Sequence, residues 1–271
     1  MTEAGAVASE LRELDDLRAL RDLFAAIWER PDEPPLTLET LKALAHSGGY
    51  VAGAHDGNRL VGGLVGWLGG APSHGFHMHS HILGVAGDSQ VRGLGFELKQ
   101  HQRRWCLERG IAVIEWTTDP LVRRNAYFNL GKLGAQAPEY LVNFYGVMAD
   151  GLNAGEESDR LLIRWRLNSE QATAAAAGRP AESDVKSLLR DGAGVVLSVG
   201  HQGEAVSASS NARVLICEVP EDIVALRHTM PSTARSWRLA VRRAFGDAFA
   251  TGYRITTATR TGHYVLERSV Q

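Results

Sequence analysis

Three histidines alternate along a short apolar segment in the first half of the chain. His77, His79 and His81 occupy every second position at the start of segment 77–85, whose apolar end and lack of proline are typical of a β-strand. Side chains alternate across a strand, so the three imidazoles should share one face, with neighbours about 6.5–7 Å apart. Imidazoles exchange protons near neutral pH and bind transition metals. The row is therefore a candidate for proton transfer, for lining an acceptor pocket or for metal binding, and hydrogen-bonded strand histidines are the structural alternative.

A carboxylate lies in the next apolar segment. Glu115 stands in the run Ile-Ala-Val-Ile-Glu-Trp, residues 111–116, where an unpaired charge is costly to bury. This segment reads as the strand expected beside the histidine strand, so Glu115 is a candidate general base. His79 and His81 are the alternative bases, the second acting through a water molecule. A structural ion pair with an arginine is the other interpretation of Glu115.

A turn containing two glycines joins the histidine strand to a helix. Segment 85–95 reads Val-Ala-Gly-Asp-Ser-Gln-Val-Arg-Gly-Leu-Gly, and apolar residues then recur at helical spacing up to Trp105. The N–H groups at such a helix start converge on one point, and the helix dipole favours an anion there. Gly93 and Gly95 lack a Cβ, which lets a diphosphate approach the backbone. The turn therefore predicts a phosphate-bearing ligand.

The spacing of this turn, Gln90-x-x-Gly93-x-Gly95, resembles the Q/R-x-x-G-x-G/A acyl-CoA signature of the GNAT (GCN5-related N-acetyltransferase) superfamily. Val85 stands where a strand of that family ends. A dinucleotide site is disfavoured, because Leu98 occupies the position of its third glycine.

The resemblance extends over about residues 10–167. Two helices (11–29 and 37–45), a strand pair (50–54 and 60–68) and the histidine strand precede the turn in the family's order. A strand at 111–117 and a second helix from about Pro120 follow it. The chain departs from the family at Leu130, where many members carry a tyrosine that serves as the general acid.

The resemblance implies a fold, a co-substrate and a set of contacts. The fold class is α/β (α+β), a GNAT fold with a mixed central sheet flanked by helices and an appended C-terminal β-β-α-β-β half. The co-substrate is acetyl-CoA or another acyl-CoA. The residues expected to bind it are Leu83, Val85, Gln90, Val91, Arg92, Gly93, Leu94, Gly95, Asn125 and Phe128.

Two further residues are candidates for contacting the acceptor. Segment 139–148 reads as a strand in which Asn143 and Tyr145 share a face, although core packing is an equal alternative for Tyr145.

The pattern of segments predicts a division of the chain into parts. Residues 1–168 would form the acyl-CoA-binding domain, 169–182 a linker or loosely helical connector, and 183–271 an accessory α/β domain. In the last part we expect strands at 195–199 and 213–219, a helix through Ala250 and a hairpin at 253–267. No catalytic motif occurs there, so it reads as a degenerate acyltransferase-like unit or a platform for dimerisation.

The composition describes an ordinary globular protein. The 271 residues carry a formal net charge of −2, which gives no electrostatic reason to expect a nucleic acid or an anionic membrane as partner. Two cysteines are too few for a disulfide framework, and the start of the chain lacks a signal-peptide profile. We expect a cytoplasmic protein, and a homodimer is left open.

Together these features predict an acyl-CoA-dependent N-acyltransferase. It would transfer an acetyl or related acyl group directly to an amine of a small molecule within a ternary complex. The alternative is a non-catalytic acyl-CoA-binding or sensing protein, which the missing tyrosine at Leu130 leaves open. A metal-dependent enzyme that uses the histidine row is the third hypothesis.

Overall fold

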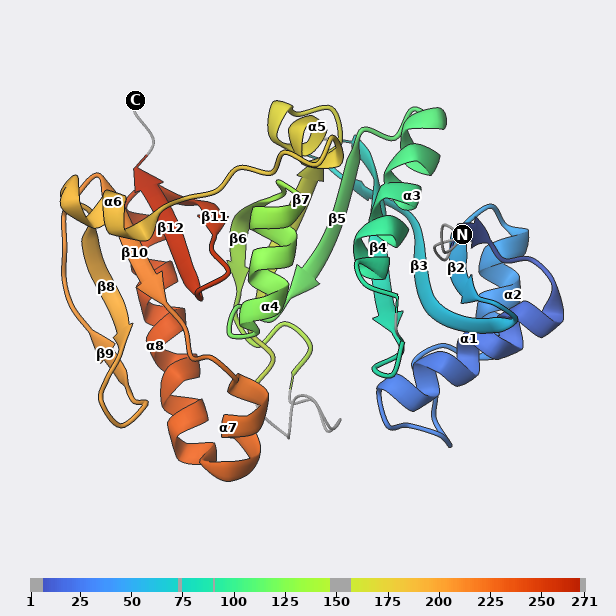
Figure 1. The fold of residues 1–271 in the computed structure, drawn as a ribbon, viewed down its shortest axis with the longest axis horizontal. Coiled ribbons are helices and arrows are strands. Elements are labelled where there is room, and N and C mark those ends of the chain that lie inside the picture. The colour runs from blue at the N-terminus through green and yellow to red at the C-terminus, as the bar shows by residue number, and fades with distance from the viewer. Residues whose placement is uncertain (1–6, 73–74, 90, 147–156, 269–271) are drawn as a thin grey trace, which may run out of the picture. The chain divides into compact units, whose positions relative to one another are not determined.

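The computed structural model describes residues 7–72, 75–89, 91–146 and 157–268 (Figure 1). The chain divides into two compact units, residues 1–116 and 117–271. The division falls inside the strand that carries Glu115. The separation into residues 1–168 and 183–271 stays a prediction.

The first unit is a five-stranded sheet with three helices. Its strands follow one another in chain order, β1 to β5, and every neighbouring pair is antiparallel except β4 with β5, which is parallel. The elements are β1 (Ala8–Glu10), α1 (Leu14–Ile27), α2 (Leu38–His46), β2 (Tyr50–Asp56), β3 (Arg59–Ala71), β4 (Gly75–Val85), α3 (Leu94–Glu108) and β5 (Val113–Thr118). The two helices and three strands that were predicted before the glycine turn are therefore confirmed within a few residues, and so are α3 and β5.

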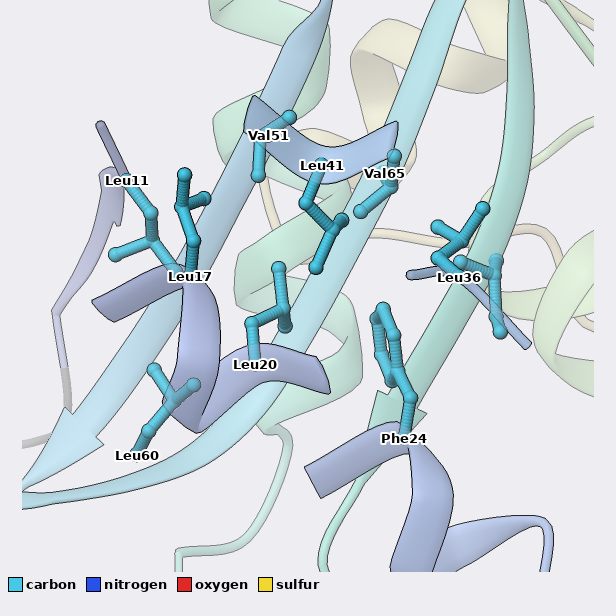
Figure 2. Close-up of a cluster of buried hydrophobic side chains, with 10 residues drawn as sticks. Leu11, Leu17, Leu20, Phe24, Leu36, Leu41, Val51, Leu60 and Val65 are labelled. Atoms are coloured by element: carbon cyan, nitrogen blue, oxygen red, sulfur yellow. The ribbon is translucent and has the colours of Figure 1, made fainter. Parts of the chain in front are cut away.

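One apolar core lies between α1, α2 and the sheet. Leucine and phenylalanine side chains of the two helices converge on valines and leucines of β2 and β3 (Figure 2). Leu17, Leu20 and Phe24 are fully buried because they recur on one face of α1. The hydroxyl of Thr37 accepts a hydrogen bond from Thr40 N at 3.2 Å and so caps α2. The face of the sheet under these two helices is called the α1 face below.

The opposite face of the sheet packs against α3. A Cβ on Gly62 would lie 3.0 Å from Leu94 and Leu98 of that helix, whereas a Cβ on Gly63 would meet Leu20 of α1 at 2.1 Å. Adjacent glycines of β3 thus permit helices to approach both faces. This second face is called the α3 face.

Strand β4 contains a bulge at His81. Val65 pairs with Ile82 and Gly66 pairs with Ser80, which leaves His81 as the extra residue. Ile82 belongs to the core on the α1 face, whereas Ser80 contacts α3. Side-chain alternation therefore restarts at the bulge.

The second unit contains a sheet in the order β7-β6-β11-β12-β10-β8-β9, in which β8 and β10 are parallel and the other described pairs antiparallel. Its elements are α4 (Arg123–Ala126), the π-helix η1 (Tyr127–Lys132), β6 (Gln136–Leu141), β7 (Arg160–Arg166), α5 (Glu170–Ala176), α6 (Val185–Arg190), β8 (Gly194–Val199), β9 (Ala205–Ser207), β10 (Val214–Glu218), α7 (Ile223–Thr229), α8 (Pro231–Ala250), β11 (Tyr253–Ala258) and β12 (His263–Arg268). The C-terminal half thus holds the four predicted strands and the predicted helix, with α6, β9 and α7 in addition.

The strand predicted at 139–148 is confirmed only as far as Leu141 and is wrong at 142–146. Strand β6 ends at Leu141, and a turn follows in which Asn143 has a φ of 47°. That left-handed conformation ends a strand. Residues 147 and 148 of the predicted strand lie outside the described residues.

The predicted connector, 169–182, is helical over its first half. The hydroxyl of Ser169 accepts a hydrogen bond from Ala172 N at 3.2 Å, which starts α5, and Ala172 and Ala175 are buried. No helix in the described part of the chain is both long and apolar enough to cross a membrane.

Candidate functional site

The histidine row lies on the α1 face of the first unit, beside a tryptophan. Trp67 of β3 is the ladder partner of His79, and their ring centroids lie 5.1 Å apart. The ring of His81 lies 4.6 Å from that of Trp67 and 5.8 Å from that of His79. His79 and His81 share a face as alternation predicts, and the bulge places the next residue, Ile82, on that face as well. The three aromatic rings form a half-exposed cluster, which we call the Trp67 cluster.

The third histidine contacts the predicted carboxylate. His77 Nε2 lies 3.5 Å from Glu115 Oε2, and both residues are buried, at 8% and 6% exposure. Glu115 is the ladder partner of His79 across the parallel pair β4–β5. A Cβ at Gly69 would lie only 2.8 Å from His77 Nε2, so the glycine makes room for the imidazole. His77 is thus one partner of Glu115, and an ion pair of Glu115 with an arginine stays a prediction.

Partial desolvation lowers the pKa of two of the imidazoles. The pKa of His79 lies below its ordinary value, first because of desolvation and then because of the neighbouring His81 and His77, while Glu115 acts in the opposite direction. Desolvation also lowers the pKa of His81. Both side chains are therefore unprotonated at neutral pH and can accept a proton.

Among the described residues, no group of three or more histidine, cysteine, aspartate or glutamate side chains is placed to hold a metal ion.

A second buried polar cluster lies on the α3 face. Lys99 Nζ donates hydrogen bonds to Ser80 Oγ at 2.7 Å and to Gln102 Oε1 at 3.2 Å, and it lies 3.8 Å from the centroid of the Trp116 ring. Burial lowers the pKa of Lys99 to about 7. The sequence analysis missed this residue, since an apolar stripe defined α3 and gave no reason to place a lysine inside it.

The turn before α3 ends at a glycine in the left-handed conformation. Gly93 has a φ of 79° and is the N-cap of α3, and the N–H groups of the first helical turn begin at Leu94 and Gly95. Val91 N donates to Ser89 Oγ at 3.3 Å, and Arg92 is exposed. Gln90 lies outside the described residues.

Leu83 and Val85 lie at the end of β4, just before this turn. Both lie on β4 after the bulge, half-buried. A Cβ at Gly84, between them, would meet Ile27 of α1 at 2.8 Å, so Gly84 faces α1 and its two neighbours face α3.

The remaining predicted contacts lie in the second unit. Asn125 is exposed on α4, and Phe128 is half-buried in η1. Leu130, at the position of the family's tyrosine, is buried at 3% exposure. The π-helix widens the backbone here, a feature found often at functional sites.

Asn143 and Tyr145 do not sit on one face of a strand, as the sequence suggested. Asn143 accepts a hydrogen bond from Ser158 N through Oδ1 at 3.2 Å, and its own N–H donates to Asp159 Oδ1 at 3.0 Å. Tyr145 is 48% exposed, and its hydroxyl lies 2.9 Å from Thr117 Oγ1. The contacts of Asn143 hold the turn together, and a role for either residue towards the acceptor stays a prediction.

Trp67 is the site residue that the sequence analysis missed. The signal was present, because the predicted hairpin and the histidine strand make β3 the neighbour of β4. If the strand register had been counted from β3, it would have placed the aromatic side chain of Trp67 opposite the histidine row. The bulge could not have been counted in this way.

Residues 17–132 match the family model described as "Acetyltransferase (GNAT) family". These residues therefore form a GNAT-family acetyltransferase domain, which includes the Trp67 cluster, the anion turn and η1. No curated protein matches the chain.

Several solved structures are similar to the chain. An aminoglycoside acetyltransferase from an uncultured soil metagenomic sample, in complex with sisomicin, is 22% identical and matches 45% of this chain and 84% of its own, with a TM-score of 0.41. Arabidopsis thaliana Naa50 with a CoA-peptide bisubstrate analogue is 18% identical, over 59% and 98% of the two chains, with a TM-score of 0.46. A ribosomal-protein-alanine N-acetyltransferase from Brucella melitensis is 20% identical, over 58% and 98%, with a TM-score of 0.47.

Proposed function

We propose that the protein is an N-acyltransferase that moves an acetyl or related acyl group from CoA to an amine of a small molecule. The observation that carries the proposal is the position of His79, whose ring lies 5.8 Å from that of His81 and whose ladder partner is the buried Glu115, in a GNAT-family domain. An alkylammonium must lose its proton before it can attack, which costs about 4 kcal/mol at neutral pH for a group with the reference pKa of lysine. A neutral imidazole on the α1 face can take that proton.

The reaction would proceed in one complex. The amine nitrogen attacks the thioester carbonyl, the new C–N bond forms, the C–S bond breaks and CoA leaves as the thiol or thiolate. The ammonium proton passes to His79, to His81 through water, or to Glu115. The amides of Gly93, Leu94 and Gly95 would hold the diphosphate of CoA.

Other contacts to CoA follow from the sequence resemblance. Gln90, Val91 and Arg92 would complete the diphosphate turn. Leu83 and Val85 would present backbone groups to the pantetheine arm, and the assignment of Asn125 and Phe128 to that arm is a proposal of the same kind.

The buried Leu130 favours a second candidate function. No hydroxyl is present at this position to protonate the leaving thiolate, which suits a protein that binds acyl-CoA without turning it over. A CoA thiolate is a stable leaving group near neutral pH, since a thiol of ordinary acidity has a pKa of about 8.5. The catalytic proposal therefore does not require the tyrosine.

An assay of CoA release separates the two candidates. Wild-type protein is incubated with acetyl-CoA and a panel of small amines at pH 7.5, and free thiol is measured over time. Acceptor-dependent release, reduced at least a hundredfold in a His79→Gln/His81→Gln double variant, supports the enzyme. Binding of acetyl-CoA by calorimetry without release for any amine supports the sensor.

A further inference from the structure

A cavity in the second unit is lined by arginines. It has a volume of about 370 Å³ and lies between the end of η1, strands β6, β7 and β11, and the start of α5. This volume is within the range of small-molecule sites. Its charged lining residues are Arg164, Arg166 and Arg254, and the described lining includes no aspartate or glutamate.

The sheet itself opens this cavity. Strands β6 and β11 pair through a single residue pair, Ala137 with Ile255. The residues on both sides of that pair, at 136–138 and 254–257, line the cavity, so it follows the weakly paired seam. Polar groups at the seam include the amide of Gln171 and the hydroxyl of Thr256.

The turn after η1 shapes one wall. Gly134 has a φ of 69°, and a Cβ there would lie 2.8 Å from the carbonyl oxygen of Gln171. A Cβ at Gly131 would lie 2.7 Å from Ala258 O. The two glycines let η1 approach α5 and β11 closely, which brings Gln171 and the three arginines to one cavity.

We propose that this cavity binds a phosphate-bearing small molecule. Planar guanidinium groups donate paired hydrogen bonds that match the oxygens of a phosphate, and they stay charged at any physiological pH. Arg254 also donates through Nη1 to Tyr253 O at 2.7 Å. The positive charges of the three lining arginines together match the two or more negative charges of a phosphate ester or a diphosphate. The site lies within the second unit and does not depend on the proposed acyl transfer.

Inorganic pyrophosphate is the probe that tests the site, with the full-length protein in 150 mM NaCl. The Gly93→Asp variant blocks the proposed diphosphate turn before α3, so binding that remains in this background belongs to another site. We expect calorimetric binding and a rise in melting temperature with pyrophosphate in the Gly93→Asp protein. We expect at least tenfold weaker binding after Arg166→Gln and Arg254→Gln are added, because the two substitutions remove two of the three guanidinium groups. Both side chains are exposed, so they can be changed without opening the core.

The control is Arg235→Gln in the same background, which removes an exposed arginine of α8 and should leave binding unchanged. Far-UV circular dichroism checks that each variant is folded, and the single arginine variants replace the double one if it is not. Loss of all pyrophosphate binding with Gly93→Asp alone would overturn the proposal, as would undiminished binding by the folded arginine variants. Equal affinity for citrate would overturn the assignment to phosphate.

Discussion

Arg238 and Asp119 form a two-point ion pair inside the second unit, although 119 residues separate them in the chain. Arg238 Nη1 and Nη2 of α8 each donate to one carboxylate oxygen at 2.8 Å. Arg227 Nη2 of α7 adds a contact of 2.5 Å to the same carboxylate. Asp119 lies within the matched GNAT-family segment, so the pair ties that segment to the C-terminal helices.

Removing this carboxylate should destabilise the protein strongly. Asp119→Ala removes the carboxylate that the buried Arg227 and Arg238 share, and we expect a loss of about 3–5 kcal/mol in the free energy of unfolding. Urea denaturation followed by circular dichroism measures it. Asp247→Ala is the control, because that carboxylate is exposed on α8, and a change within about 0.5 kcal/mol is expected. A change that small for Asp119→Ala would show that the cluster contributes little.

The same pair predicts a dependence of stability on acid pH. Desolvation works against the charged form of Asp119, but the hydrogen bonds and charges of Arg238 and Arg227 outweigh it, so its pKa lies well below the usual range. A depressed folded-state pKa stabilises the protein at any pH above the unfolded value of about 3.9, and the stabilisation is lost as the pH falls through the folded value. Urea denaturation at pH values from about 4 downwards should show a steeper loss of stability for wild type than for Asp119→Asn. Parallel curves would exclude this role.

The turn before α3 can be tested with CoA itself. Gly93→Asp introduces a negative charge at the N-cap of α3, at a φ of 79° that suits glycine. Saturating CoA should raise the melting temperature of wild type and change that of the variant little. Gly110→Asp, at the other end of α3 and also at positive φ, is the matched control and should keep the wild-type response. A variant at Gly93 that retains this response would place the diphosphate elsewhere.

Three substitutions identify the base. We expect the group that accepts the proton to show a loss of about a hundredfold or more in kcat on replacement, with acyl-CoA affinity nearly unchanged. Glu115→Gln, His79→Gln and His81→Gln are compared across pH 5–9. The lowered pKa values of His79 and His81 place an imidazole-dependent acidic limb below pH 6.5, and the replacement that removes this limb names the base. Wild-type turnover in all three variants would exclude the α1 face as the source of the base.

The C-terminal half should contribute structure and no chemistry. His201 and His228 are both exposed, and the stripe of α8 that includes Trp237, Val241 and Phe245 is buried. Replacing either histidine by alanine should leave turnover nearly intact. A hundredfold loss in a folded variant, which is about 2.7 kcal/mol of activation free energy, would contradict this assignment.

Local signals in the sequence were sufficient for much of the first unit. Thr37 starts α2 through its own hydroxyl, and the alternating histidines define one face of β4. Strand β6 stopped early for a reason that lies 15 and 16 residues further along the chain, in the contacts of Ser158 and Asp159 with Asn143. Tertiary contacts of this kind leave no local pattern.

Part of the candidate site could likewise be predicted from the sequence, and part could not. The residue types of His77, His79 and Glu115 were visible in the sequence, and so was the anion turn. The companion ring of Trp67 and the buried amine of Lys99 became visible only through cross-strand register and through the packing of α3. Neither feature follows from periodicity within one element.

The extra residue at His81 sets the phase of β4. Upstream of it, odd-numbered side chains from His77 onwards face α1, and downstream of it even-numbered ones do, beginning with Ile82. Without the bulge, unbroken alternation along the same residues would turn Ile82 and Gly84 to the α3 face whenever His77 and His79 face α1, so the strand could keep either its core residues or its imidazoles on the α1 face, but not both. A single insertion in the ladder thus allows one strand to supply the hydrophobic core with one half and the proposed proton acceptors with the other.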